Sequence, residues 1–389
     1  MHSLKIVITL MISGSCFWVS LFAENEFSGK LQAELNGLIV GSEVPGATLA
    51  VILPDDTLIN LSAGVSDLEN RRPMRPTDVM LSGSIGKTYV MAVLMQLVDE
   101  KRMAIDDYLW QYLGREPWFS RLPNARDVTL RMLLNHTAGI PEYIEKESLW
   151  DEVREHPDKV WSGPERLIYI LGDSPRNEAG KGWSYADTHY IVLGMVIEKV
   201  TGTEYYRELQ QRILTPMKLE RTIPADRRIL PGLIPGYSRL DSPFNFKGRV
   251  LDEKGRYLFN PQLEWTGGGL ASNAAELAKW AKILFSGQVI EKELLPEIMQ
   301  GVKTGSSYEY GLGVIIWNAD FGTLYGHMGF APGYNSIMGY VPSRKIAVAM
   351  QFNCDYPGQV LKKDRYECLE RFIRLAVAFA AGSSPSAPS

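Results

Sequence analysis

Strand-like segments lie near both ends of this 389-residue chain, and helical segments fill the middle. After an amphipathic helix expected over 27–41, apolar runs at 47–53 and 58–64 have the length and composition of strands. Strand character returns only near the C-terminus, at 311–317, 323–327, 334–340 and 346–352, followed by a helix at 358–380. Apolar strands must be buried against neighbours, so the two ends are expected to meet. The pattern predicts an α+β fold, with an antiparallel sheet built from both chain ends and flanking helices.

The middle of the chain is expected to form a mainly helical second lobe. Its helices are predicted at 87–102, 128–135, 164–172, 187–200, 204–213 and 273–286. Long connections near 140–160 and 225–262 are typical of the walls or lids of a site. The expected organisation is one domain with a cleft between its lobes. It comprises 24–380, with a sheet lobe of 24–80 and 300–380, a helical lobe of 81–299 and a disordered tail at 381–389.

The first 23 residues have the pattern of a signal peptide. Lys5 precedes an apolar stretch from Ile6 to Phe22, and Ala23 provides a small residue before the cut. We therefore expect a bacterial protein that is periplasmic or secreted. Ser13-Gly14-Ser15-Cys16 faintly resembles a lipoprotein cleavage box but lacks its leucine. Membrane attachment is expected only through a lipidated or uncleaved N-terminus.

Composition excludes several classes of partner. The formal net charge is -4 and no block of lysine and arginine occurs, so a nucleic-acid partner is not expected. Beyond the signal peptide only Cys354 and Cys368 remain, and they are expected either to form a disulfide or to stay free. Neither has a second cysteine or a histidine at metal-ligand spacing, and we expect no metal and no cofactor.

A serine and a lysine stand at the start of the apolar helix that follows Leu81. Ser84 lies where free backbone N–H groups and the positive end of the helix dipole favour an alkoxide or an oxyanion. Lys87 lies on the same face and, when partly desolvated, can accept the serine proton. A capping serine followed by a solvated lysine is the ordinary alternative, since one such spacing is expected by chance.

Two other segments contain residues that could complete the chemistry. Tyr185 lies in a glycine-bounded turn before a helix, where a phenol near an ammonium has a lowered pKa and can exchange protons with Ser84. His327 lies at a strand edge between Gly326 and Gly329, where glycines let a substrate approach the backbone. Each residue alone is more often structural, but their order after Ser84 favours a site.

These motifs resemble those of the serine β-lactamase and penicillin-binding protein superfamily. The resemblance is to the branch with class C β-lactamases, D-Ala-D-Ala carboxypeptidases and β-lactamase-like esterases, and it covers most of 43–353. The matching segments are Val44-Pro45-Gly46-Ala47, Gly83-Ser84-Ile85-Gly86-Lys87-Thr88, Leu133-Leu134-Asn135-His136-Thr137-Ala138-Gly139, Tyr185-Ala186-Asp187, Leu193-Gly194, Val200-Thr201-Gly202, Gly267-Gly268-Gly269-Leu270 and Tyr310-Gly311-Leu312-Gly313.

The resemblance implies a β-lactamase/transpeptidase-like fold and a role for each catalytic residue. Ser84 would be the acylated nucleophile, and Lys87 and Tyr185 the pair that shuttles protons. The backbone N–H groups of Ser84 and Phe330 would form the oxyanion hole. His136 looks like the family's structural histidine beneath the site.

The family's third motif has two candidates in this chain. Lys303-Thr304-Gly305 matches it literally but precedes Tyr310, whereas the family's motif follows that landmark. His327-Met328-Gly329 has the right context, so these three residues are assigned to substrate binding and Lys303 is expected in a solvated loop.

Two departures from the family's pattern bear on the substrate. Met328 has no hydroxyl and His327 would be only partly charged near neutral pH, so a substrate carboxylate would be held weakly unless an arginine from elsewhere binds it. Asp187 replaces an asparagine and can accept but not donate. It would keep Lys87 charged, leaving Tyr185 as the resting base, or receive a substrate amine.

The sequence thus predicts an exported serine hydrolase that forms an acyl-enzyme at Ser84 on small-molecule substrates. Carboxylesters are slightly preferred over small peptide-like amides because the carboxylate anchor looks degraded. One alternative is a D-Ala-D-Ala carboxypeptidase or weak β-lactamase of the cell envelope. Another is a non-hydrolytic protein that binds wall peptides or penicillin.

Overall fold

The centre of the molecule is a nine-stranded sheet in which all neighbours are antiparallel. The computed structural model describes residues 24–382, so the predicted signal peptide and most of the predicted tail lie outside the described residues. In spatial order the strands are β3 (Arg72–Pro73), β2 (Leu58–Asp67), β1 (Gly46–Ile52), β14 (Ile346–Phe352), β13 (Tyr334–Val341), β12 (Gly322–Ala331), β11 (Ile315–Ala319), β10 (Glu309–Tyr310) and β9 (Val302–Lys303).

The two ends of the chain meet in the middle of this sheet, as the sequence predicts. β1 pairs with β14, with Ala50 opposite Ala349. Both strands are buried along their whole length, which explains why they are continuous apolar runs rather than alternating ones. The predicted α+β fold with a large antiparallel sheet is confirmed.

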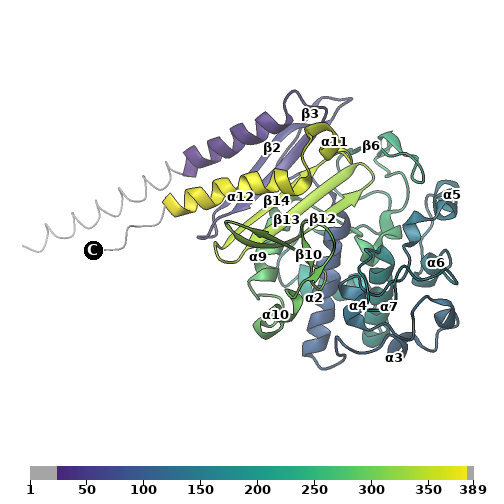
Figure 1. Ribbon diagram of the computed structural model, residues 1–389. Helices are drawn as coiled ribbons and strands as arrows, with labels where there is room; N and C mark the ends of the chain where they lie inside the picture. The colour runs from purple at the N-terminus through teal and green to yellow at the C-terminus, as the bar shows by residue number, and fades with distance from the viewer. Residues whose placement is uncertain (1–23, 383–389) are drawn as a thin grey trace, which may run out of the picture.

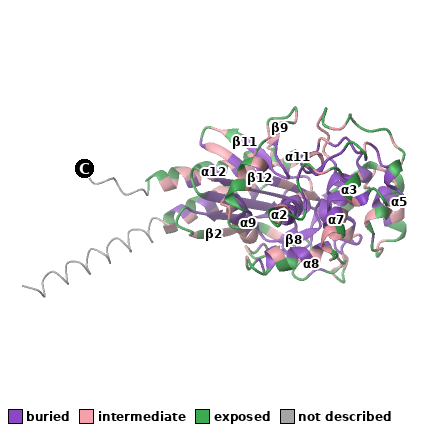
Figure 2. Cartoon of the chain, turned by 90° about the horizontal axis from the view of Figure 1, so that it is seen from below, coloured by how far each residue is buried: buried purple, intermediate pink, exposed green. Residues whose placement is uncertain are grey.

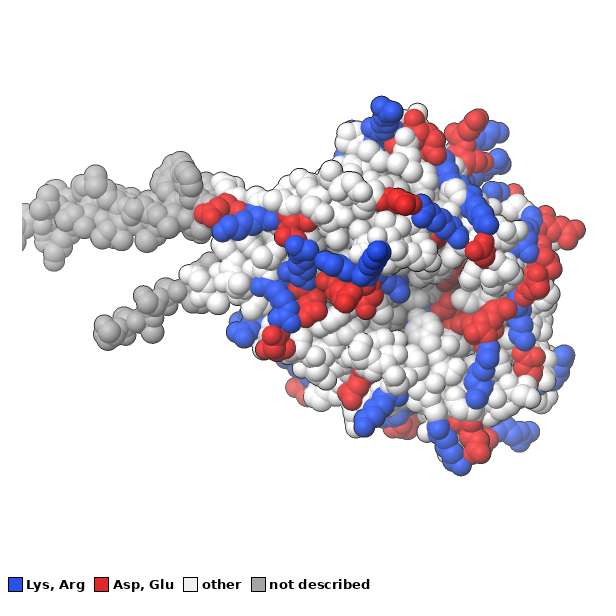
Figure 3. All heavy atoms as spheres, turned by 45° about the horizontal axis from the view of Figure 1, so that its top comes forward, with Lys and Arg blue, Asp and Glu red and all other residues white. Residues whose placement is uncertain are grey.

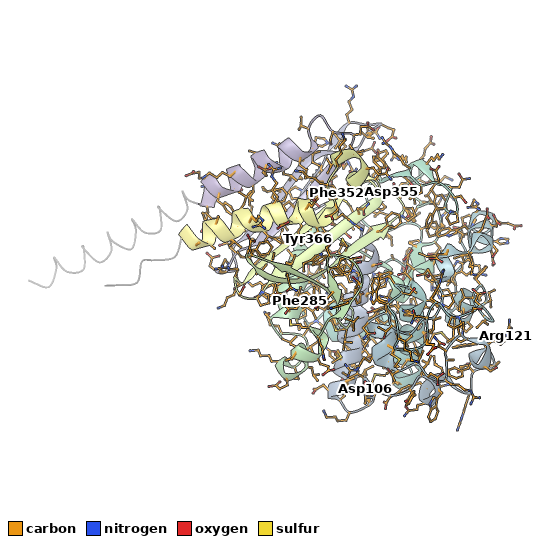
Figure 4. All side chains as sticks on the ribbon, in the orientation of Figure 1. Asp106, Arg121, Phe285, Phe352, Asp355 and Tyr366 are labelled. Carbon is orange, nitrogen blue, oxygen red and sulfur yellow. The ribbon has the colours of Figure 1, made fainter. Side chains whose placement is uncertain are left out.

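Helices cover both faces of the sheet. The helix over 24–39 and α12 (Arg365–Gly382) lie side by side on one face (Figure 1), where Phe27 stacks on Phe379 with ring centroids 4.1 Å apart. On the other face lies α9 (Ala274–Phe285), which packs against β1, β13 and β14. The sequence placed this segment in the helical lobe, but its apolar face meets the sheet. Figure 4 labels Phe285 at the end of α9, where its ring lies 6.0 Å from that of Tyr325.

The second lobe is mainly helical. Its helices are α2 (Gly86–Asp99), α3 (Trp110–Leu113), α4 (Leu130–Leu134), α5 (Glu147–Glu155), α6 (Gly163–Leu167), α7 (Asp187–Thr201) and α8 (Tyr205–Leu209). α2 is buried almost throughout and lies between the two lobes (Figures 1 and 2), which is why its sequence is nearly all apolar.

Several elements differ from the sequence-based expectations. α5 lies inside the stretch 140–160 that was expected to be a loop. The last helix is divided into α11 (Pro357–Leu361) and α12, because Lys362 adopts a left-handed conformation with φ 52°. The stretch 225–262 contains a hairpin of β6 (Tyr237–Arg239) and β7 (Lys247–Arg249).

A second small sheet, not foreseen from the sequence, lies next to the turn before α2, where the Ser82 N–H donates to the Leu270 carbonyl over 2.8 Å. It joins β4 (Met80–Leu81), β8 (Leu270–Ser272) and β5 (Ile223–Pro224). The segment before Ser84 is therefore anchored to chain from much later in the sequence. A further short helix, α10 (Leu295–Ile298), precedes β9 in the chain.

The surface shown in Figure 3 carries acidic and basic side chains mixed together rather than in a patch of one sign. Between residues 24 and 382, no helix is long and apolar enough to cross a membrane. Cys354 and Cys368 are both buried and both free thiols, which decides between the two expectations for this pair.

Candidate active site

Ser84 lies in a 3-10 turn, Gly83–Ile85, between β4 and α2. It is partly exposed, whereas Gly83 and Ile85 are buried. Gly83 has φ 53°, and a Cβ there would lie 2.3 Å from the backbone nitrogen of Phe330. Only glycine allows both this conformation and this approach of β12. The turn therefore places the Ser84 hydroxyl beside the strand that contains Phe330.

Lys87, the second residue of α2, has a fully buried side chain with three acceptors around its ammonium. Its Nζ lies 3.0 Å from Ser84 Oγ and also donates to the carboxylate of Asp187 and the carbonyl of Gly267. Burial disfavours the ammonium, but the negative charge of Asp187 and the hydrogen bonds to Asp187 and Tyr185 favour it, and the pKa of Lys87 is raised. Lys87 is therefore charged in the resting protein, as the aspartate in place of asparagine led us to expect.

Tyr185 is partly exposed and its hydroxyl interacts with both Lys87 and Ser84. Lys87 Nζ also lies 4.9 Å from the centre of the tyrosine ring. Burial raises the pKa of the Tyr185 hydroxyl, although the charge of Lys87 lowers it. The sequence-based expectation that Tyr185 has a lowered pKa and is the resting base is therefore wrong, because desolvation outweighs the nearby ammonium. In the resting state the pair is an ammonium and a neutral phenol.

Asp187 is the first residue of α7 and belongs to a group of three carboxyl groups. Glu142 is buried and its carboxylate accepts the backbone N–H of Asp187, which caps the start of α7. Glu264 is partly exposed and lies close enough to Asp187 and Lys87 for their charges to act on it. Burial, followed by the negative charge of Asp187, raises the pKa of Glu142 and that of Glu264 to about 8. An arriving cation would favour the ionised form of Glu264.

The strand wall opposite is formed by β12. Met328 and Phe330 are partly exposed, whereas Gly329 is buried. A Cβ at Gly329 would lie 1.7 Å from the carbonyl oxygen of Ser82, so the strand can pass this close only with glycine there. Ser336 on β13 donates to the same Ser82 oxygen over 2.7 Å. These contacts hold the nucleophile turn against the strand that the sequence assigned to the oxyanion hole.

The imidazole of His327 faces inward and is 1% exposed. Its Nδ1 donates to the Met328 carbonyl, so Nε2 accepts from the Tyr310 hydroxyl at 2.8 Å. Burial, together with the nearby charge of Lys87, lowers the pKa of His327 to about 3. The expectation that His327 is partly charged near neutral pH is thus wrong, and its ring acts on the site only through its neighbours.

His136 lies beneath the tyrosine, as its resemblance to a structural histidine implied. Its ring lies 4.2 Å from that of Tyr185, and its Nδ1 accepts from the Ala186 N–H at 3.3 Å. His189 Nδ1 therefore donates to the same atom over 2.9 Å. Burial lowers the pKa of His136, so the ring is a neutral support for the Tyr185 turn.

Lys303 is exposed in the edge strand β9, away from Ser84, in line with its expected solvation although not in a loop. The sequence did not identify Glu142, Glu264, Gly267 or Arg365 as site residues. Only Gly267 lay in a matching segment, and the other three had no motif to mark them. Within 24–382, no group of three or more His, Cys, Asp and Glu side chains is arranged to hold a metal ion.

Comparison with known proteins gives consistent matches over most of the chain. A family model described as Beta-lactamase matches residues 32–370. Penicillin-binding protein 4* of Bacillus subtilis (strain 168) is 25% identical over 327 residues, which cover 79% of this chain and 68% of that protein. The D-aminopeptidase of Brucella anthropi is 23% identical over 314 residues, covering 79% of this chain but only 56% of that protein.

A solved structure agrees with these matches. The D-stereospecific amidohydrolase from Streptomyces sp. superposes with a TM-score of 0.74 and 27% identity, over 84% of this chain and 95% of that one. The expected family and fold are thus confirmed, and the matching proteins include enzymes named for cleaving amide and peptide bonds.

Proposed function

The chain belongs to the Beta-lactamase family and is a serine hydrolase, and we propose that Ser84 forms an acyl-enzyme with small amides and short peptides that carry a free ammonium group. The observation that carries this proposal is the position of Lys87. Its ammonium lies 3.0 Å from Ser84 Oγ and is paired with Asp187, and the carboxyl group of Glu264 is close enough for the charges of both residues to act on it.

The protonation states of Lys87 and Tyr185 determine which form of the site can react. In the resting state Lys87 is an ammonium and Tyr185 a phenol, so neither can accept the Ser84 proton. The reactive form is the one in which this pair has lost a single proton. Ser84 Oγ then attacks the substrate carbonyl carbon while its proton passes to the pair. The pair returns the proton to the leaving amine when the carbon–nitrogen bond breaks, and water repeats the cycle on the acyl-enzyme.

The negative oxygen formed during the attack needs donors that are already in place. The N–H groups of Ser84 and Phe330 are suited to this role, because β12 is held against the nucleophile turn by the close approach at Gly83 and Gly329. The neutral His327 adds no charge to this wall.

The acidic groups support an ammonium-bearing substrate. Asp187 is occupied by Lys87, whereas Glu264 is partly exposed, and no hydrogen bond to its carboxylate occurs among the described residues. A substrate ammonium near Glu264 would pair with a carboxylate that burial otherwise keeps partly protonated. The names of the relatives point the same way, since a D-aminopeptidase acts at a free amino end. We propose D-amino acid amides and peptides with an N-terminal D-residue as the substrate class.

Carboxylesters, which the sequence slightly favoured, remain a prediction, because the same nucleophile and donors serve an ester. The wall-directed alternatives need a cation for a substrate carboxylate. Arg365 lies near the strand wall, and the similarity to penicillin-binding protein 4* keeps this second candidate open to test.

The test uses D-phenylalanine p-nitroanilide, its L-isomer, its N-acetyl derivative and p-nitrophenyl acetate. We expect turnover of the unblocked D-anilide and an intact-mass adduct with a fluorophosphonate, both lost in Ser84→Ala. N-acetylation is expected to lower kcat/KM about tenfold or more, since it removes a charge-assisted hydrogen bond. Absence of any Ser84-dependent adduct or turnover would overturn the proposal.

Two further outcomes separate the substrate classes. Equal turnover of the free and acetylated anilides would refute ammonium recognition while leaving the hydrolase. A lasting adduct with a labelled penicillin, without turnover of anilide or ester, would favour the wall-binding alternatives.

We also propose that the protein is exported, from the pattern in residues 1–23. Mass spectrometry of the protein isolated from its host is expected to give a mature N-terminus at Glu24. A lipidated Cys16 would instead indicate a lipoprotein, and an intact Met1 would count against export.

A further inference from the structure

One arginine donates to the peptide group next to the nucleophile. Arg365 Nη1 lies 2.8 Å from the carbonyl oxygen of Gly329 and 2.8 Å from Asn335 Oδ1. The Gly329 carbonyl and the Phe330 N–H belong to the same peptide group. Arg365 therefore contacts the far end of the group whose N–H is assigned to the oxyanion hole.

Arg365 is held firmly for this contact. It is the first residue of α12, where Asp364 and Glu367 each accept the other's backbone N–H at 2.8 Å. This reciprocal capping fixes the first turn of the helix. The neighbouring Tyr366, labelled in Figure 4, stacks on Trp317 with ring centroids 5.2 Å apart.

The acceptors are equally fixed. Asn335 is buried, lies opposite Phe330 in the β12–β13 ladder and donates its amide to the Cys354 carbonyl at 3.1 Å. Gly329 lies opposite Ser336 in the same ladder, which orients its peptide plane. Burial lowers the pKa of Arg365, but a guanidinium remains charged in a protein.

We propose that Arg365 is a positioning residue that polarises the Gly329–Phe330 peptide group and so strengthens the Phe330 N–H as an oxyanion-hole donor. A cation at a carbonyl oxygen draws electron density through the amide and makes its N–H more positive. This adds to the stabilisation of an oxyanion without any direct contact between Arg365 and the substrate. The catalytic part of this inference rests on the proposed function, whereas the polarisation does not.

The sequence offers a probe for this single peptide group. Glycine followed by phenylalanine occurs once in the chain, at Gly329-Phe330. Labelling glycine with carbonyl ¹³C and phenylalanine with ¹⁵N therefore selects one amide signal in a carbon-edited NMR spectrum. In Arg365→Gln, we expect the Gly329 carbonyl carbon and the Phe330 amide proton to move upfield. The control is Arg371→Gln, which removes another arginine of α12, one that is paired with Glu34 of the N-terminal helix. It is expected to move neither of the two signals.

The kinetic arm uses the neutral substrate p-nitrophenyl acetate, which has no carboxylate for an arginine to bind. Loss of a direct donor costs 10²–10³ in kcat, so an indirect effect of about tenfold on kcat with little change in KM is expected for Arg365→Gln. Arg365→Lys, which keeps the charge, is expected to recover part of both the signal position and kcat.

The outcomes distinguish a failure of the proposed polarisation from a failure of the proposed function. Unchanged signals in Arg365→Gln would overturn the polarisation, whatever the enzyme does. A change confined to KM for carboxylate-bearing substrates would overturn it in favour of direct carboxylate binding by Arg365. Absence of any Ser84-dependent chemistry in the wild type would instead count against the proposed function. The NMR measurement would still test whether Arg365 polarises the Gly329–Phe330 peptide group.

Discussion

Two walls flank Ser84, and they stabilise charge by different means. On the helical wall, Lys87 pairs directly with Asp187, and the carboxyl groups of Glu142 and Glu264 lie close enough for the charges of this pair to act on them. On the strand wall, backbone groups of β12 face the nucleophile, and the guanidinium of Arg365 acts from behind a peptide group. In the proposed mechanism, the helical wall transfers protons and the strand wall stabilises the negative oxygen that forms during attack. Mutations on the first wall should therefore change pH dependence, and those on the second should change kcat alone.

The largest effect is expected from substitution of Ser84, which lies between the two walls. Ser84→Ala should lower kcat/KM by at least about 10³-fold and abolish the fluorophosphonate adduct, because it removes the proposed nucleophilic oxygen. Ser82→Ala is the matched control, since the Ser82 hydroxyl is buried and has no hydrogen-bond partner among residues 24–382. A Ser84→Ala protein that keeps the adduct would disprove the assignment of the nucleophile.

The next effect tests proton transfer on the helical wall. Tyr185→Phe removes the hydroxyl that interacts with Lys87 and Ser84 but keeps the ring that packs on His136. Loss of a general acid–base group of this kind should lower kcat by about 10²–10⁴. Thermal unfolding of Tyr185→Phe should match that of the wild type. A kcat within threefold of the wild type would show that Lys87 alone moves the proton.

Asp187→Asn should shift the pH profile rather than only lower the rate. The negative charge of Asp187 raises the pKa of both Lys87 and Tyr185, so removing it lowers both. The rising limb of kcat/KM should therefore move to lower pH by about 1 to 3 units, the usual effect of a contacting charge. Rates of p-nitrophenyl acetate hydrolysis from pH 6 to 10 measure the limb. An unmoved limb would mean that the pair does not supply the base.

The smallest effect tests substrate recognition on the same wall. Glu264→Gln should raise KM for D-phenylalanine p-nitroanilide about tenfold, the effect of one charge-assisted hydrogen bond, and change the KM for p-nitrophenyl acetate much less. In the wild type, KM for the anilide should pass through a minimum near pH 8, because Glu264 ionises there and the substrate ammonium, with an ordinary pKa of about 8, loses its proton above it. Equal changes for both substrates would indicate a structural role for Glu264 instead.

Much of the architecture could be predicted because it depends on local sequence patterns. The apolar runs of β1 and β14 and the helical periodicity after Ser84 depend only on neighbouring residues. The start of α7 at Asp187 was predicted at its exact residue. The break between α11 and α12, by contrast, follows from the left-handed conformation of Lys362, which no sequence pattern predicted.

The electrostatics of the site could not be predicted in the same way. The pKa of Tyr185 is raised rather than lowered, and His327 is neutral, because each side chain is buried among residues distant in sequence. Glu264 and Arg365 reach the site from segments with no motif, and only the folded chain brings them to Ser84.

The sequence by itself determined the family resemblance, the meeting of the chain ends in one sheet, and the pairing of Ser84 with Lys87 at a helix start. These depend on spacing along the chain, which fixes which residues share a face. The tertiary structure decided which groups are charged and which peptide group a distant arginine polarises. Desolvation and charge interaction depend on distances in space, and those exist only once the chain has folded.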